Sequence, residues 1–274
     1  MEGKNMSEKN MLEVKSVSKT FNPGQITERK ALRNVSLSLN EGDFVTVIGG
    51  NGAGKSTLLN MIAGVYTCDT GTISLDGNDI TKIPEHKRAK FLGRVFQDPM
   101  MGTAATMQIE ENLAMAYRRG KRRGLHWGVT SKERQMFRDH LAKLDLGLEN
   151  RMQTKVGLLS GGQRQALTLL MATLQKPQLL LLDEHTAALD PKTAKKVLEL
   201  TEYFVKRDNL TTFMVTHNMK DAIHYGNRLI MMLDGQIVYE ASGEEKKNLQ
   251  VKDLLEKFQT AGGEESVPDK MILG

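Results

Sequence analysis

The sequence contains little cysteine and no long apolar run. Cys68 is the only cysteine among 274 residues, so an internal disulfide is excluded and a reducing compartment fits the composition. The longest apolar runs, Leu167–Leu174 and Leu179–Leu182, are too short to span a bilayer. The polar opening, Met1–Asn10, also lacks the apolar stretch of a secretory signal. We therefore expect a cytoplasmic chain that does not itself cross a membrane.

An excess of charge of either sign is also lacking. The formal net charge of +5 is modest for this length and gives weak support to a nucleic-acid partner. With 39% hydrophobic residues and 6 prolines, the composition is that of an ordinary folded domain. Basic residues concentrate only in Arg118–Arg123, a cluster that a solvated helix end explains in the simplest way.

Short apolar runs alternate with helical patterns, which is typical of a parallel sheet covered by helices. Asp190 and Pro191 supply an N-cap and a first-turn proline for a helix running towards Asp208. Asp234 followed by Gly235 predicts a hairpin turn. Strands are predicted at Phe44–Ile48, Arg94–Phe96, Leu179–Leu182, Thr211–Val215 and Leu229–Leu233.

Between residues 97 and 157 the pattern is mostly helical. Ile109–Tyr117 is one predicted helix, and Thr130 with Glu133 forms a capping-box pair that opens another through Leu144. After Tyr239 we expect the chain to leave the core, with a short amphipathic helix at about 249–258 and a frayed tail.

A glycine-rich loop follows the first predicted strand. Gly49–Ser56 fits the pattern G-x-x-x-x-G-K-[ST] between a strand and a helix, the context of a P-loop. Backbone N–H groups then face the phosphates, Lys55 reaches the β and γ phosphates, and Ser56 holds Mg²⁺. The loop predicts ATP with Mg²⁺, bound by Asn51, Gly52, Ala53, Gly54, Lys55, Ser56 and Thr57.

Two acids stand at the carboxyl end of the strand Leu179–Leu182, where open α/β sheets bind their ligands. Asp183 suits the magnesium shell. Glu184, one residue further, is placed to orient or deprotonate a water that attacks the γ phosphate. The chemistry predicted for the chain is therefore ATP hydrolysis.

A second phosphate site is predicted at Leu159–Gln163. Ser160 and two glycines open the helix Gln163–Leu174 and make another anion-binding helix terminus. Here the sequence resembles the ATP-binding subunits of ABC transporters, whose signature is Leu-Ser-Gly-Gly-Gln, over roughly residues 12–239. The nucleotide contacts implied at this terminus are Ser160, Gly161, Gly162 and Gln163.

The resemblance implies an α/β fold with a P-loop NTPase (RecA-like) core, an antiparallel β subdomain and an inserted α-helical subdomain. The cassette would occupy residues 11–240, with the helical subdomain at about 98–157. Residues 241–274 would form a C-terminal helix and a flexible tail.

The remaining landmarks of the family also fall in order. Gln97 resembles the Q-loop glutamine, which contacts nucleotide, metal and permease, and Asp190 resembles the D-loop aspartate. His217 resembles the switch histidine, which would hold the γ phosphate and the attacking water. Phe21 matches the aromatic that stacks on adenine, although an ordinary core aromatic also fits. His185 departs from the family, which usually has proline there.

In this family the signature of one subunit closes over ATP held by the P-loop of its partner. The resemblance therefore implies a head-to-tail dimer of two copies, bound to a membrane permease at the inner face of the membrane. The resemblance extends to cassettes of amino-acid importers at Met101–Met107 and Asp183–Asp190. Such an importer would also use an extracytoplasmic binding protein. Exporters can have the same organisation, with a separate cassette subunit. Because the family's helical subdomain faces the bilayer, Arg122 and Arg123 are alternatively predicted to contact anionic lipids.

Two other functions fit the sequence less well than transport. An ABC ATPase of chromosome maintenance would carry a long coiled coil between Lys55 and Ser160, which holds no sustained heptads, and one of translation would carry two cassettes. A nucleotide-binding regulator without catalysis would lack Glu184 or His217, and both are present. We therefore expect a transport ATPase without a nucleic-acid partner.

Overall fold

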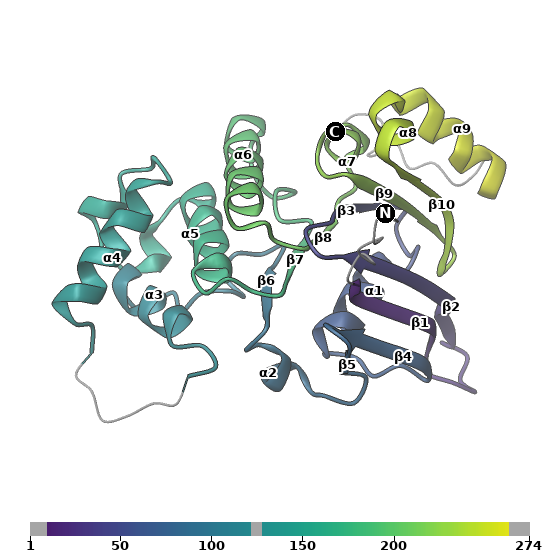
Figure 1. The fold of residues 1–274 in the computed structure, drawn as a ribbon, viewed down its shortest axis with the longest axis horizontal. Helices are drawn as coiled ribbons and strands as arrows, with labels where there is room; N and C mark the ends of the chain where they lie inside the picture. The colour runs from purple at the N-terminus through teal and green to yellow at the C-terminus, as the bar shows by residue number, and fades with distance from the viewer. Residues whose placement is uncertain (1–9, 122–127, 263–274) are drawn as a thin grey trace, which may run out of the picture. The chain divides into compact units, whose positions relative to one another are not determined.

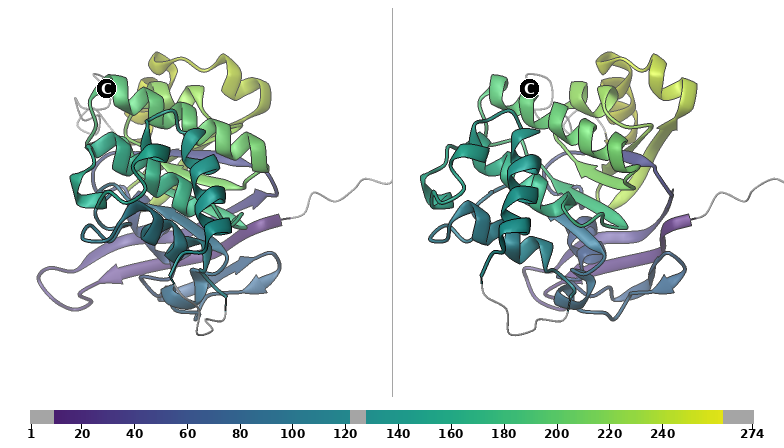
Figure 2. Two further views of the ribbon diagram at one scale, coloured as in Figure 1. Left: turned by 90° about the vertical axis from the view of Figure 1, so that its left-hand side faces the viewer. Right: turned by 60° about the vertical axis from the view of Figure 1, so that its left-hand side comes forward.

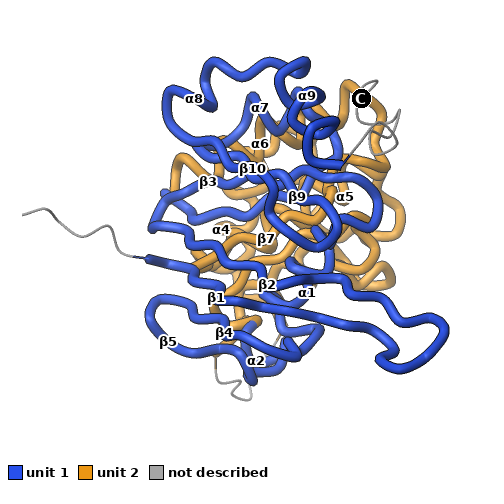
Figure 3. Tube along the Cα trace, turned by 90° about the vertical axis from the view of Figure 1, so that its right-hand side faces the viewer, with its two compact units in different colours: residues 1–88, 209–274 blue, residues 89–208 orange. Residues whose placement is uncertain are grey.

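The computed structural model describes residues 10–121 and 128–262, which fall into two compact units. The first unit combines residues 1–88 with 209–274, and the second consists of residues 89–208 (Figure 3). In the described part of the chain no helix is both long and apolar enough to span a bilayer. The lipid contact predicted for Arg122 and Arg123 and the tail beyond residue 262 lie outside the described residues.

Strand pairing organises the first unit (Figure 1). β1 pairs antiparallel with both β2 and β4, while β3 runs parallel to both β8 and β9, and β10 joins β9 antiparallel. The elements of this unit are β1 (Asn10–Phe21), β2 (Arg29–Asn40), β3 (Phe44–Ile48), α1 (Lys55–Ala63), β4 (Thr70–Leu75), β5 (Asn78–Asp79), α2 (Glu85–Arg88), β8 (Thr212–Val215), α7 (Met219–His224), β9 (Arg228–Leu233), β10 (Gln236–Ser242), α8 (Gly243–Asn248) and α9 (Val251–Gly262).

The predicted strand Phe44–Ile48 is confirmed as β3, and every residue of it is buried. It is an apolar run without alternation because both of its neighbours are parallel strands and both of its faces are covered. α1 contacts β2 as well as β8, so this helix joins the two sheets of the unit. The predicted hairpin is also confirmed, with left-handed φ at both Asp234 and Gly235, as a type I′ turn requires.

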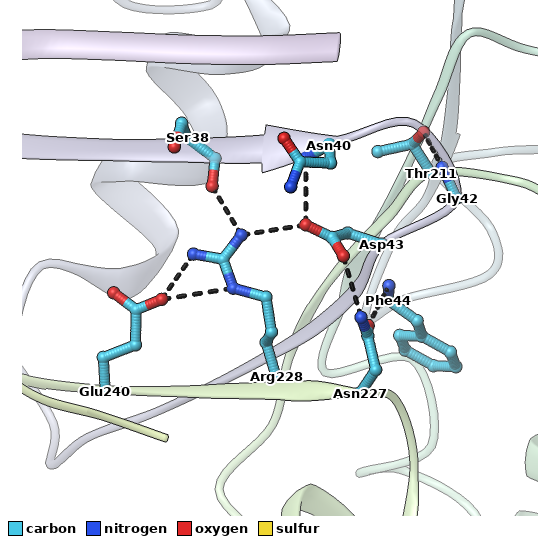
Figure 4. Close-up of polar contacts among 9 residues, drawn as sticks. All are labelled: Ser38, Asn40, Gly42, Asp43, Phe44, Thr211, Asn227, Arg228 and Glu240. Atoms are coloured by element: carbon cyan, nitrogen blue, oxygen red, sulfur yellow. Dashed lines mark hydrogen bonds and ion pairs between the residues drawn. The ribbon is translucent and has the colours of Figure 1, made fainter. Parts of the chain in front are cut away.

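A partly buried ion network fixes the edge of this sheet (Figure 4). The guanidinium of Arg228 donates to the carboxylate of Asp43 at 2.8 Å, to the backbone carbonyl of Ser38 at 2.7 Å, and to Glu240. Asp43 in turn accepts from the side-chain amide of Asn227 at 2.8 Å. The network joins β2, β9 and β10 through hydrogen bonds and ion pairs between residues that are far apart in the sequence.

The expectation that the chain leaves the core after Tyr239 is wrong. β10 continues to Ser242, and the amphipathic helix, confirmed as α9, buries Leu254 and Phe258 completely against α7 and β9. Leu254 and Phe258 are four residues apart and therefore share one face of the helix. That apolar face packs against the cluster of Ile48, Met219, Ala222, Leu229 and Met231.

The second unit contains a parallel strand pair and most of the helices predicted between residues 97 and 208. β6 pairs with β7 so that Val95 lies opposite Leu182. α5 and α6 pack side by side, as Figures 1 and 2 show for the teal and green helices. The elements are β6 (Leu92–Val95), α3 (Ile109–Tyr117), α4 (Ser131–Ala142), the 3₁₀ helices η1 (Leu148–Asn150) and η2 (Val156–Leu158), α5 (Gly161–Thr173), β7 (Leu179–Asp183) and α6 (Pro191–Asp208).

Two local signals at the starts of helices are confirmed here. Thr130 and Glu133 form the predicted capping box of α4, and Asp190 accepts from the backbone N–H of Thr193 at 3.1 Å at the start of α6. The predicted helical subdomain at 98–157 lies inside this unit, and its boundaries remain a prediction.

The basic cluster after α3 is not a simple solvated helix end. Arg118 is bonded to the carboxylate of Glu133 at 2.9 Å, and Arg119 donates to the backbone carbonyl of Ala172 at 3.2 Å. Burial lowers the pKa of Arg119. Lys121 lies 4.0 Å from the centre of the Tyr117 ring. The side chains of Arg118 and Arg119 therefore bond to other residues of the second unit, and the prediction of a solvated helix end is wrong for them.

Candidate functional site

The glycine loop after β3 has the backbone geometry of a P-loop. Gly54, which precedes α1, has a φ of 100°. A Cβ atom on Gly54 would lie 2.6 Å from the backbone oxygen of Ala31 and 2.8 Å from Leu32. The backbone N–H of Gly235 also donates to the Ala53 carbonyl at 3.1 Å. The loop is thus held between β2 and the β9–β10 turn, and its conformation requires glycine.

Lys55 and the start of α1 supply positive charge at this loop. Lys55 is only 6% exposed, and its ammonium donates to the backbone carbonyls of Gly49 at 2.6 Å and Gly50 at 3.2 Å. The first turn of α1 contains no acidic residue, so the partial positive charge of its N-terminus is not offset. Asn51, Gly52 and Ser56 are exposed, while Thr57 is half-buried. These groups can bind a phosphate chain.

His217 lies at the same edge of the sheet as the glycine loop. β3 and β8 are parallel with Val47 opposite Val215, and the backbone N–H of Thr216 donates to the Val47 carbonyl at 3.0 Å. The next residue, His217, is half-buried. Asn218 then caps α7 by accepting from the backbone N–H of Lys220 at 2.9 Å. The first unit therefore brings the predicted switch histidine to the strand edge where the P-loop begins.

Phe21 ends β1 close to the glycine loop. Its ring packs edge-to-face on Tyr66, with ring centres 5.2 Å apart, and remains half-buried. Its cross-strand partner is Arg29, whose guanidinium donates to the backbone carbonyl of Gly52 at 3.1 Å. Arg29 was missed at the level of the sequence, because no local pattern shows that the start of β2 reaches the P-loop.

The predicted acids and Gln97 come together in the second unit. Because β6 and β7 are parallel with Val95 opposite Leu182, Gln97 lies just beyond β6 at the edge where Asp183 ends β7 and Glu184 follows it. Asp183 carries a side chain that is 16% exposed, 3.9 Å from the guanidinium of Arg94. Arg94 was also missed, since only strand pairing places it beside the acid.

The oxygen groups that could hold magnesium fit that ion chemically. Ser56 offers an exposed hydroxyl and Asp183 a partly exposed carboxylate, and both are hard oxygen donors of the kind that Mg²⁺ prefers. The described residues contain no cluster of three or more His, Cys, Asp or Glu side chains arranged for a metal. A P-loop magnesium does not need such a cluster, because water and phosphate oxygens complete its coordination.

The signature residues lie at the N-terminus of α5. Ser160 is the N-cap and forms a capping box with Gln163, whose backbone N–H donates to the Ser160 hydroxyl at 3.3 Å. α5 starts at Gly161, two residues earlier than predicted, because the capping serine precedes both glycines. A Cβ on Gly162 would lie 2.0 Å from Cγ2 of Thr193, so α5 approaches α6 closely.

Asp190, the predicted D-loop aspartate, is therefore a neighbour of the signature. It is exposed, and hydrogen bonding to Thr193 lowers the pKa of its carboxyl. The structure thus groups the P-loop with His217 and Phe21 in the first unit. In the second unit it groups Gln97 with Asp183 and Glu184, and the signature with Asp190. The functional roles of all these residues remain predictions.

Comparisons with known proteins agree on one family. The sequence profile described as "ABC transporter" matches residues 32–187. The chain is 46% identical over 253 residues to a tyrosine transport ATP-binding protein of Clostridioides difficile (strain R20291), covering 92% of this chain and all of that protein. It is 34% identical over 258 residues to the ABC transporter ATP-binding protein YxdL of Bacillus subtilis (strain 168), covering 93% and 95% of the two chains.

Solved structures give the same result. The dimeric post-hydrolysis state of the ATP-binding cassette MJ0796, bound to ADP and Pi, matches with a TM-score of 0.72 at 31% identity, covering 85% of this chain and 98% of that one. The P-loop NTPase fold with its helical and β parts is thereby confirmed. This chain belongs to the ABC transporter family, as an ATP-binding subunit that hydrolyses ATP.

Proposed function

We propose that the chain is the motor of an importer and that two copies, joined head to tail, drive a separate membrane permease. The observation that carries this proposal is that one chain has two helix N-termini suited to phosphate, α1 after the P-loop and α5 after Ser160. A single ATP held by the P-loop needs only the first. The second is available for ATP held by a partner copy.

The first unit would bind the nucleotide. The N–H groups of Asn51 to Thr57 and the ammonium of Lys55 would bind the phosphates, with Lys55 leaving the loop carbonyls that it now contacts. Phe21 would stack on adenine through its ring, which is half-buried. His217 would donate to the γ phosphate from the adjacent strand end.

Magnesium would be held by Ser56, Gln97 and Asp183, and when bound it would neutralise charge on the β and γ phosphates. Glu184 would orient and deprotonate the attacking water, while Ser160 to Gln163 and Asp190 would complete the site of the partner copy. Closure of the dimer on ATP and its reopening after hydrolysis would move the permease. The dimeric structure of the similar cassette MJ0796 supports the proposal that two copies form a dimer.

The substrate class and location follow from the similar proteins. One relative is named for tyrosine transport, and others are named for import of spermidine with putrescine and of thiamine. We therefore propose an amino-acid importer with an extracytoplasmic binding protein, and a chain that is held at the cytoplasmic face through the permease. The substrate would contact those partners, so this chain would not need a substrate pocket of its own.

The catalytic assignment is tested by replacing Glu184. Glu184→Gln should retain ATP binding while kcat falls by about 10²- to 10⁴-fold, because the amide cannot accept a proton from water. Lys55→Ala is the contrasting variant and should lose ATP binding itself. Both are measured by phosphate release and by binding of a fluorescent ATP analogue. Wild-type turnover in Glu184→Gln would refute the role of Glu184.

The partners are tested with the same variant. Tagged Glu184→Gln chain is held closed with Mg-ATP, membranes are extracted in mild detergent, and co-purifying proteins are identified by mass spectrometry. One multi-spanning permease in stoichiometric amount is expected. Recovery of ribosomal or chromosomal proteins in its place would assign the motor to another machine.

A further inference from the structure

The backbone of Glu184 has an unusual conformation. Its φ is 43°, in the left-handed region that a residue with a side chain seldom occupies. Such a conformation costs on the order of 1–3 kcal/mol and persists only where surrounding contacts hold it. The carbonyl of Glu184 accepts from the backbone N–H of Ala187 at 3.0 Å, so Glu184 is the first residue of a tight turn. His185 and Thr186 are the central residues of that turn.

His185 is more deeply buried than the residues that follow it in this loop. Its side chain is buried and only 2% exposed, whereas Ala187 and Ala188 are exposed. The Nε2 atom of His185 lies 3.1 Å from the hydroxyl of Thr201 on α6, a residue that is also buried. The imidazole therefore ties the first central residue of the turn to the middle of a long helix.

The direction of this hydrogen bond follows from the second bond of Thr201. The Thr201 hydroxyl donates its single hydrogen to the backbone carbonyl of Val197 at 2.9 Å. It can therefore only accept from His185, so the imidazole carries its hydrogen on Nε2. The far end of the connection is fixed as well, because Asp190 caps α6 through Thr193. The segment from Glu184 to Asp190 is thus hydrogen-bonded to α6 near both of its ends, through His185 and through Asp190.

We propose that His185 is a positioning residue for Glu184: its bond to Thr201 holds the turn that keeps Glu184 in its left-handed conformation and its carboxylate in the working orientation. This inference rests on the proposed catalytic role of Glu184. It accounts for the histidine at a position where the family usually has proline, since a side-chain anchor replaces a rigid ring as the restraint on the turn.

The test removes the acceptor and leaves the catalytic loop itself unchanged. Thr201→Val has the same shape without the hydroxyl, and Thr201→Ser, which keeps the hydroxyl, is the matched control. We expect Thr201→Val to lower kcat about tenfold with KM for ATP unchanged, and Thr201→Ser to stay within about twofold of wild type. Thermal unfolding is recorded for both variants, to check that each is folded at the assay temperature.

A second variant keeps the test decisive if Thr201→Val does not fold. His185→Leu removes the donor without leaving a buried N–H unpaired, because Thr201 keeps its bond to Val197. It should lower kcat as much as Thr201→Val, and the double variant should be no slower than either single one. In a Glu184→Gln background neither change should slow the residual turnover further.

Three outcomes separate the possibilities. If Thr201→Val and His185→Leu lower the melting temperature but leave kcat unchanged, His185 only stabilises the fold and the inference is overturned. If they slow Glu184→Gln by the same factor as wild type, they do not act through Glu184, which also overturns it. If Glu184→Gln itself hydrolyses ATP at the wild-type rate, the proposed function fails first.

Discussion

The P-loop and the loop from Glu184 to Asp190 both present reactive groups after a buried parallel strand, yet they are held by different means. In the P-loop, glycines allow the backbone to approach β2 and the hairpin of β9 and β10 closely. In the acidic loop, side chains hold the shape, through His185 bonded to Thr201 and Asp190 bonded to Thr193.

A loop whose shape depends on glycine is sensitive to any added side-chain atom. A loop held by side chains is sensitive to loss of a hydrogen-bond partner. A Cβ on Gly49 or Gly54 would meet backbone atoms, which cannot move aside. A lost hydrogen bond in the acidic loop would release a conformation that is costly by itself.

Gly54→Ala should give the largest effect. Its φ of 100° is unfavourable for alanine, and the new Cβ would lie 2.6 Å from the Ala31 carbonyl oxygen. We expect ATP binding to weaken by at least ~100-fold, measured with a fluorescent ATP analogue. Gly52→Ala in the same loop, where φ is also positive at 85° but a Cβ would meet only the Arg29 side chain at 3.2 Å, separates strain from the clash with backbone. Equal losses in both variants would show that the close approach is unimportant.

Gly162→Ala should give an intermediate effect that a second change relieves. The added Cβ would lie 2.0 Å from Cγ2 of Thr193, a side-chain atom, and overpacking of this kind costs about 1–3 kcal/mol. Thr193→Ser removes that methyl group and keeps the backbone N–H that Asp190 accepts from. The double variant should recover most of the stability lost by Gly162→Ala, as followed by urea unfolding. Without any recovery, the contact of α5 with α6 would not be the cause.

Arg29→Ala should give the smallest effect. Arg29 is exposed, and its one bond to the Gly52 carbonyl contributes about 0.5–1.5 kcal/mol to holding the loop. We expect KM for ATP to rise about 2- to 10-fold with the melting temperature unchanged. Lys30→Ala, the adjacent exposed residue on β2, is the control and should leave KM unchanged. A larger change in kcat than in KM would instead place Arg29 in the chemistry.

The sequence predicted those features that neighbouring residues create. The P-loop pattern, the capping box of Thr130 with Glu133, and the hairpin at Asp234 and Gly235 each depend on contacts within about four residues. The strand Phe44–Ile48 was predicted because burial on both faces leaves an apolar run that only Thr46 interrupts. The predicted site residues group at strand edges and helix starts because parallel strands bring their carboxyl ends together.

Pairings between residues far apart in the chain could not be predicted from local patterns. Arg29 reaches Gly52, Arg119 bonds to Ala172, and Phe258 completes a core cluster that includes Ile48, so the C-terminal helix belongs to the fold. Apolar spacing identified α9 as amphipathic but could not show which surface it covers. A local pattern records which face of an element is apolar or charged, whereas the partner of that face depends on how the whole chain closes.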